Sequence, residues 1–224
     1  MIGTKPEQFL TAWEDYVYHQ SELTTIHPRI MKSWKRCRAY LNPFQHIQPA
    51  HLNEEILLAT QVASFDLISV ARPVLEEIFE NIEHSGTAVV LTNSAGYVLD
   101  ILSDPIGAEL LHSLGIKQGV SLTEIQYGTN AFGLALIERM PARVVGAEHY
   151  LRHFHPIADL AAPVFDWNGS PPGAPGAQSK LPPPAAAPFD SDPAGILATP
   201  CYVAVFRLLP AIPAYSRQRP RPAK

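Results

Sequence analysis

Five polar side chains beside predicted turns are the strongest candidates for binding chemistry in this chain. They are Glu124, Thr129, Asn130, Glu148 and His149. Carboxylate, hydroxyl, amide and imidazole groups can together donate hydrogen bonds to a small molecule and accept them from it, and binding residues often lie on loops. The five residues are therefore candidates for the polar end of an effector pocket. For Thr129 and Asn130 the alternative, which we favour, is that they cap the helix that follows.

Three histidines lie close together in the sequence, at positions 149, 153 and 155. His149 and His153 share one face if their segment is helical, as metal-binding pairs do, and Glu148 or Asp159 could add a carboxylate. No H-E-x-x-H motif is present, however. We therefore expect no metal ion, and we interpret His149 as making a structural hydrogen bond at a strand-to-helix turn.

Motifs of known enzymes are missing from the sequence. It contains no G-x-S-x-G nucleophile elbow and no G-x-x-x-x-G-K-[ST] loop to hold the phosphates of ATP. Cys37 has basic neighbours that could lower the pKa of a thiol, but no base is close in sequence, and a small buried residue is the better interpretation. We predict that the chain is not an enzyme and uses no cofactor. A small metal-dependent enzyme is the weaker alternative.

The composition is that of a globular protein. Of 224 residues, 46% are hydrophobic and 17% are charged, and the net charge of -4 gives no basic surface for nucleic acid. Cys37 and Cys201 are far apart, which argues against a disulfide framework or a zinc module. The start does not resemble a signal peptide, and no stretch approaches the ~18 consecutive apolar residues of a membrane span. We expect a cytoplasmic location, with no binding to nucleic acid or membrane.

Helices are predicted in the first third of the chain. Apolar residues at helical spacing predict one helix over Glu7–Gln20 and a second that begins at Pro28, whose basic residues favour a solvated face over DNA contact. Prolines predict a loop over 40–50. Asn53 can cap a long helix that Pro73 breaks or kinks. After the break, an apolar stripe predicts that the helix lies flat against a sheet.

The sheet is predicted to follow these helices. Thr87–Thr92 and Tyr97–Leu102 are joined by a short turn with a glycine, which indicates a hairpin. A short helix is predicted over Glu109–Leu114. Arg143–Val145 and Ala161–Phe165 are further predicted strands.

Several motifs occur in an order that is typical of one family. These are S-W-x-R-C at Ser33–Cys37, a V-x-L-T hairpin with Asn93 where aspartate is common, a G-T-N-A turn followed by a helix that Pro141 stops, and V-x-G-A-E-H at 144–149. In these motifs the chain resembles the GAF sensor domain of bacterial sigma-54-dependent activators of the acetoin and dihydroxyacetone operon type. The resemblance runs from Ser33 to about Gly176.

The resemblance implies an α/β (α+β) fold, in which helices flank a GAF-like antiparallel sheet. It places the sensor domain at residues 53–168, after a helical leader at 1–52. It also implies regulation: a small effector or a regulatory protein shifts the domain between two states, which requires unequal affinity for them. We expect a homodimer. Because the chain as given lacks the ATPase and DNA-binding domains of such activators, we expect that it cannot act on RNA polymerase unaided.

An alternative function comes from a different class of protein. The chain could be an interaction module that dimerises, without a ligand, through its N-terminal helix and the Asn53–Glu83 helices. Size-exclusion chromatography and a ligand-stabilisation screen would distinguish the two functions.

Residues 169–224 differ in character from the rest of the chain. Of the 22 prolines, nine precede Trp167 and thirteen follow it. We predict a disordered, Pro-rich tail, in which Cys201–Leu209 is apolar enough for a strand but stands alone. The family pattern fails near Gly176, which suggests a lost reading frame; a genuine Pro-rich linker is the alternative. Without the last strand, the sheet would expose an edge beside Ala161–Phe165 and invite aggregation.

Overall fold

The computed structural model describes residues 6–21, 24–82, 86–164 and 201–209. Its helices are α1 (Pro6–His19), α2 (Pro28–Arg38), α3 (Glu54–Ala63), α4 (Phe65–Glu80), α5 (Pro105–Ser113), α6 (Glu124–Tyr127) and α7 (Ala131–Glu138), with short 3-10 helices η1 (Gly146–Glu148) and η2 (Arg152–Phe154). Its strands are β1 (Thr87–Thr92), β2 (Val98–Ser103), β3 (Ala142–Val145), β4 (Ile157–Val164) and β5 (Cys201–Leu208).

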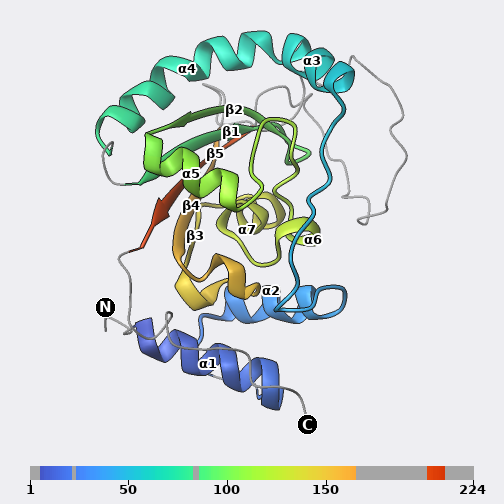
Figure 1. Ribbon diagram of the computed structural model, residues 1–224, viewed down its shortest axis with the longest axis vertical. Coiled ribbons are helices and arrows are strands. Elements are labelled where there is room, and N and C mark those ends of the chain that lie inside the picture. The colour runs from blue at the N-terminus through green and yellow to red at the C-terminus, as the bar shows by residue number, and fades with distance from the viewer. Residues whose placement is uncertain (1–5, 22–23, 83–85, 165–200, 210–224) are drawn as a thin grey trace.

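The five strands form one antiparallel sheet in the order β2-β1-β5-β4-β3, with helices on both sides (Figure 1). Alternate residues of a strand point to opposite faces, so β1 contributes to two cores. Val89 and Leu91 pack with Leu75 of α4 on one face, while Ala88 and Val90 belong to the larger cluster on the other. The predicted fold class is confirmed.

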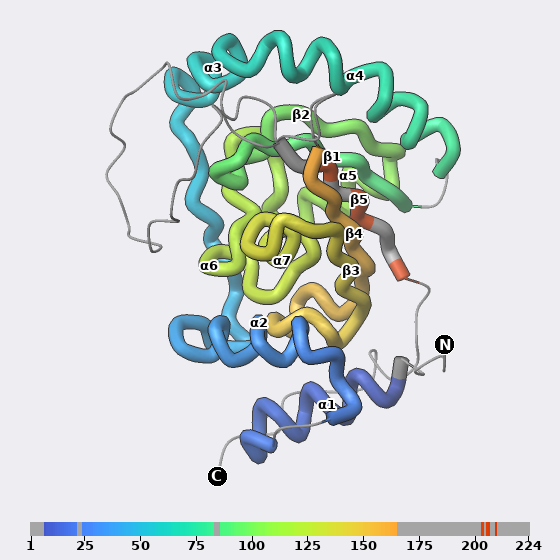
Figure 2. Tube along the Cα trace, turned by 180° about the vertical axis from the view of Figure 1, so that it is seen from behind, coloured from blue at the N-terminus to red at the C-terminus, as the bar shows by residue number. Residues whose placement is uncertain are grey.

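The larger core includes the N-terminal helices. Trp13 of α1 and Trp34 of α2 are fully buried, and each indole N–H must find an acceptor there. The Trp13 Nε1–H donates to the Tyr150 carbonyl at 2.8 Å, and the Trp34 Nε1–H donates to the Glu148 carbonyl at 2.7 Å. Both predicted helices therefore exist, and both are fastened to the backbone around η1. Figure 2 shows them below the sheet from the opposite side.

The helical break lies elsewhere than predicted. Asn53 caps α3 as expected, because its side chain accepts from the Ile56 N–H at 2.8 Å. The chain then bends by 79° between α3 and α4, at Ser64, and α4 continues through Pro73. Proline inside a helix costs about 3 kcal/mol, which packing of a buried face can offset. Leu75 and its neighbours on α4 provide that packing against β1.

The hairpin turn follows the sequence closely. The Asn93 side-chain oxygen accepts from the Ala95 N–H at 3.1 Å and the Tyr97 N–H at 3.0 Å, the Asx-type bonding that turns use. Gly96 has φ +92°, and a Cβ there would lie 2.9 Å from Thr123 Cγ2. The turn therefore needs glycine for both its conformation and its space.

The segment Cys201–Leu208 is a central strand and not part of a disordered tail. β5 pairs with β1 on one side and with β4 on the other, and Phe206 is buried in the larger core. The predicted exposed edge beside Ala161–Phe165 is therefore wrong, because β5 covers the flank of β4 and the edge strands are β2 and β3. The other residues predicted as tail, 169–200 and 210–224, lie outside the described residues.

Within the described ranges, no single helix is both long and apolar enough to cross a membrane. α3 and α4 satisfy the length and composition criteria only as a pair, and the pair is sharply bent.

Candidate functional site

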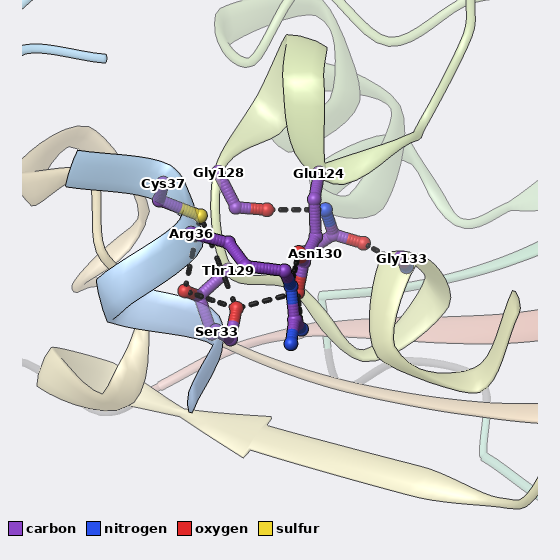
Figure 3. A network of polar contacts seen from close by, with 8 residues as sticks. All are labelled: Ser33, Arg36, Cys37, Glu124, Gly128, Thr129, Asn130 and Gly133. Atoms are coloured by element: carbon purple, nitrogen blue, oxygen red, sulfur yellow. Dashed lines mark hydrogen bonds and ion pairs between the residues drawn. The ribbon is translucent and has the colours of Figure 1, made fainter. Parts of the chain in front are cut away.

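Two of the sequence motifs meet in a buried polar cluster between α2 and α6, which we call the α2–α6 junction. Its members are Ser33, Arg36 and Cys37 of α2, Glu124 of α6, and Thr129 in the turn after α6 (Figure 3). Ser33, Cys37 and Thr129 have no exposed surface, and Glu124 is almost fully buried. Helical spacing puts residues 33, 36 and 37 on one face of α2, so the S-W-x-R-C motif supplies three of the five side chains.

The Glu124 carboxylate is the centre of this junction. The Arg36 Nε–H donates to Oε2 and its Nη2–H donates to Oε1, each at 2.8 Å, in the two-point geometry that a guanidinium and a carboxylate favour. The Ser33 hydroxyl donates to Oε1 at 2.5 Å. Because a buried carboxylate is costly without partners, these three bonds explain how Glu124 can be buried.

The remaining hydroxyl and thiol groups form a series of hydrogen bonds that ends at this carboxylate. The Ser33 hydrogen is used by Glu124, so the Thr129 hydroxyl donates to Ser33 Oγ at 2.7 Å. The Cys37 thiol then donates to Thr129 Oγ1 at 3.5 Å. Each group has one hydrogen to give, so the order of donors is determined by the carboxylate at the end.

Cys37 is a buried thiol and not an activated nucleophile. Burial, followed by the charge of Glu124, raises its pKa to about 11, although hydrogen bonding with Thr129, Ser33 and Tyr40 opposes the shift. The basic neighbours in the sequence therefore do not lower this pKa. Arg36, which the sequence assigned to a solvated face, is instead paired with Glu124.

The G-T-N-A turn fits α7 closely against the junction. Asn130 caps α7, since its side-chain oxygen accepts from the Gly133 N–H at 2.7 Å while its amide donates to the Gly128 carbonyl at 2.8 Å. Gly128 has φ +66°, which favours glycine. A Cβ on Gly133 would lie 2.8 Å from Glu124 Cγ, so glycine there leaves room for the carboxylate. Asn130 therefore acts as the helix cap that the sequence favoured, whereas Thr129 belongs to the junction.

His149 belongs to a second buried pair. Its Nε2 lies 3.0 Å from Asp159 Oδ1, and its Nδ1 lies 2.9 Å from the Gly146 carbonyl. A carbonyl cannot donate, so Nδ1 carries a hydrogen. The other Asp159 oxygen accepts from the Ala131 N–H at 2.8 Å, at the start of α7. His149 therefore joins the turn after β3 to β4 and α7, which agrees with a structural hydrogen bond.

His149 and His153, which we considered from the sequence as a metal-binding pair and did not favour, are not placed to bind an ion together. His149 and His153 do not share a helix, because η1 and η2 are separate short turns, and His153 lies at the surface with Nε2 3.1 Å from the Ser113 carbonyl. Leu151, between the two histidines, and Phe154, after His153, are buried. Within the described residues, no group of three or more His, Cys, Asp or Glu side chains could hold a metal ion.

Glu148 is the predicted residue that lines an open hollow. Its Oε2 accepts from the Val145 N–H at 2.9 Å, and burial raises the pKa of its carboxyl. The hollow has a volume of about 430 Å³. Glu124, Thr129, Asn130 and His149 do not line this hollow; they are buried and already bonded within the chain. Sequence reasoning did not name Ser33 and Arg36 as partners of Glu124, although the S-W-x-R-C motif contains both.

Comparison with known proteins identifies the family. The model of the MimR N-terminal domain matches residues 7–168. The chain belongs to this family. The match includes α1 and α2 as well as the predicted sensor region, and it ends before β5.

The curated relatives of this family member include transcriptional regulators. The acetoin dehydrogenase operon activator AcoR of Bacillus subtilis is 30% identical over 65% of this chain and 24% of its own length. The propane 2-monooxygenase operon activator MimR of Mycolicibacterium goodii is 30% identical over 70% and 25%. The glycerol metabolism operon regulatory protein of Citrobacter freundii is 27% identical over 62% and 22%. The chain thus spans about a quarter of the length of these relatives.

A solved structure shares the fold of this family member. The crystal structure of the Escherichia coli DhaR(N)–DhaL complex contains a chain that matches 82% of this one and 53% of its own length, with a TM-score of 0.66 and 18% identity. These comparisons confirm the resemblance to sensor domains of operon activators. They also confirm that the chain is a regulator's domain and not an enzyme.

Proposed function

We propose that the chain is the signal-sensing domain of a sigma-54-dependent transcriptional activator and that it takes its signal from a small effector or a regulatory protein. Its site of action is the cytoplasm, and it relays the signal to ATPase and DNA-binding domains like those of full-length activators. Two findings support this proposal: the relatives are operon activators, and the structural neighbour DhaR(N) was crystallised in a complex with DhaL.

The observation that carries the proposal is the α2–α6 junction. It connects the N-terminal helices to the loops around α6 and α7 by one charge pair and a chain of hydroxyl bonds. Buried polar networks have few alternative arrangements, so we expect a change in those loops to be transmitted to α2. A signal reaches another domain only if the sensor has two states that the signal binds unequally, and we propose that α2 differs in position between them.

A chimeric activator tests this function. The full 224-residue chain would replace the N-terminal part of Bacillus subtilis AcoR, and transcription from the AcoR-dependent promoter would be measured across a set of metabolites and candidate partner proteins. We expect at least one addition to change transcription, and Glu124→Ala to abolish the change. If the chimera is expressed but none of the metabolites or partner proteins changes transcription, the result argues against a sensing role.

The second candidate function, helix-mediated dimerisation, is favoured by exposed apolar residues on α3 and α4. Leu58 and Val62 on α3 and Phe65, Val70 and Val74 on α4 are exposed, with Val70 at 77%. Exposed apolar residues that recur along one helix pair suit a helix from a second copy. The N-terminal helix contributes less, because Trp13 and Tyr16 of α1 are buried in the core.

Analytical ultracentrifugation tests the dimer. Val70→Glu is expected to convert a dimer to a monomer, whereas Ile106→Glu, at an exposed position of α5, is the matched control and leaves the dimer intact. A monomer at all concentrations of the unchanged protein would remove this candidate.

A further inference from the structure

The hollow beside Glu148 lies where α2 and α7 meet the β3 edge of the sheet. Its volume of about 430 Å³ is within the range of small-molecule sites, roughly 300–1,000 Å³. Both helices and β4 contribute apolar side chains to its lining, which also includes charged side chains. The lining residues are His27, Arg29, Ile30, Leu134, Pro141, Ala142, Arg143, Glu148 and Leu160.

Arg29 lines this hollow, and one of its donors has no acceptor among the described residues. Its Nε–H donates to Glu138 Oε2, and its Nη1–H donates to the Pro141 carbonyl at 3.1 Å. Its Nη2 is buried and has no hydrogen-bond partner in the part of the chain that the structure describes. A buried donor without a partner costs roughly 1–3 kcal/mol, so a ligand acceptor toward which the guanidinium turned its Nη2 would remove this cost.

Arg143 and Glu148 add one charge of each sign. Arg143 is exposed on β3, and no described residue bonds to its guanidinium. The residue opposite Arg143 on the neighbouring strand β4 is Leu160, which also lines the hollow. The carboxylate of Glu148 uses one oxygen for the Val145 N–H. Two guanidinium groups favour a planar carboxylate, whereas Glu148 repels an anion unless the ligand also carries a hydrogen to donate.

We infer that this hollow binds a small aliphatic hydroxycarboxylate, whose carboxylate contacts Arg29 and Arg143 and whose hydroxyl donates to Glu148. Ile30, Leu134 and Leu160 enclose its hydrocarbon part. The inference rests on the proposed sensing function and names the class of its effector. A bound molecule would contact α2 through Arg29 and the segment after β3 through Glu148, whose carbonyl holds Trp34 of α2.

Isothermal titration of the full chain with lactate, propionate, 1,2-propanediol and inorganic sulfate tests the assignment. We expect lactate to bind and propionate to bind about tenfold more weakly because it lacks the hydroxyl. The diol lacks a carboxylate, and sulfate has no hydrogen to donate, so neither should bind. Arg143→Gln should weaken lactate binding at least tenfold. Arg139→Asn is the matched control: Arg139 is also exposed but does not line the hollow, and asparagine tolerates its left-handed conformation.

Glu148→Gln tests whether the ligand hydroxyl bonds to the carboxylate of residue 148. The amide oxygen can still accept from Val145, so the fold is kept, but the preference for lactate over propionate should shrink toward equality. Equal binding of sulfate and lactate, absence of lactate binding, or lactate binding unchanged by Arg143→Gln would each overturn the assignment. If lactate does not bind but the chimeric activator responds to another signal, only the lactate assignment fails and the sensing proposal is kept. If the chimera responds to no signal, the sensing proposal fails even when lactate binds.

Discussion

Arg36 and Glu124 are 88 positions apart in the sequence and meet through two hydrogen bonds of 2.8 Å. The pair joins α2 to α6 and orders the Ser33, Thr129 and Cys37 groups behind it. Arg36 remains 37% exposed while Glu124 is buried, so the carboxylate depends on this contact more than the guanidinium does.

Loss of the Glu124 carboxylate should destabilise the fold. We expect Glu124→Ala to lower the free energy of unfolding by about 2 kcal/mol, below the ~3–5 kcal/mol of a fully buried pair because water screens Arg36. Urea unfolding followed by circular dichroism measures this change. Glu109→Ala, at an exposed position of α5, serves as the control and should change stability by less than about 0.5 kcal/mol. Equal effects of the two substitutions would contradict the importance of the pair.

The Cys37 thiol should be inert in the folded protein. Burial raises its pKa to about 11, so almost no thiolate exists at pH 8 and reagents cannot reach it. In a Cys201→Ser variant, a thiol-reactive dye should label Cys37 only at the rate of unfolding and rapidly in urea. Because the folded pKa is raised, stability should fall as pH rises from about 9 to about 11. Fast labelling without denaturant would show that the junction opens.

His155 should make the fold sensitive to acid. Burial, with charge from His149 and Arg152, lowers its pKa to about 3. His155 binds a proton near pH 6.5 in the unfolded chain but not in the folded chain. Its contribution to the free energy of unfolding is therefore complete above that pH and is lost as pH falls toward 3. Between these two pH values, we expect the free energy of unfolding to fall by about 1.4 kcal/mol per pH unit.

A variant isolates this contribution of His155. His155→Phe keeps a ring that can pack against Trp13, whose centroid is 4.7 Å away, and should flatten the pH dependence of unfolding between pH 4 and 6 relative to the unchanged chain. Identical slopes for the two proteins would assign the acid sensitivity to other groups.

β5 should be required for the fold. Phe206→Ala removes a buried ring from the larger core, and we expect a loss of about 3 kcal/mol in the free energy of unfolding. A chain that stops before Cys201 should lose cooperative thermal unfolding altogether, since β1 and β4 would both lose a partner. If the shortened chain melted as cooperatively as the full one, the position of β5 in the sheet would be wrong.

Local patterns in the sequence predicted most of the elements. Apolar spacing located α1, α2 and the sheet-facing helix, and the Asn93 turn and the Asn53 and Asn130 caps follow from side chains that bond within three or four positions. Such contacts depend on nearby residues alone, so one sequence can determine them. The order of the motifs also indicated the family, which the match to residues 7–168 confirms.

Long-range contacts were decided only by the tertiary structure. Pro73 lies inside α4 because packing on β1 outweighs its cost, and Cys201–Leu208 becomes a strand because β1 and β4 offer it partners on both sides. The sequence placed Glu124 and Arg36 in separate roles, as a ligand contact and a solvated cation. Nothing in the local pattern shows that the fold brings them together, because the free energy of such a pair depends on burial and geometry that arise only when the chain has folded.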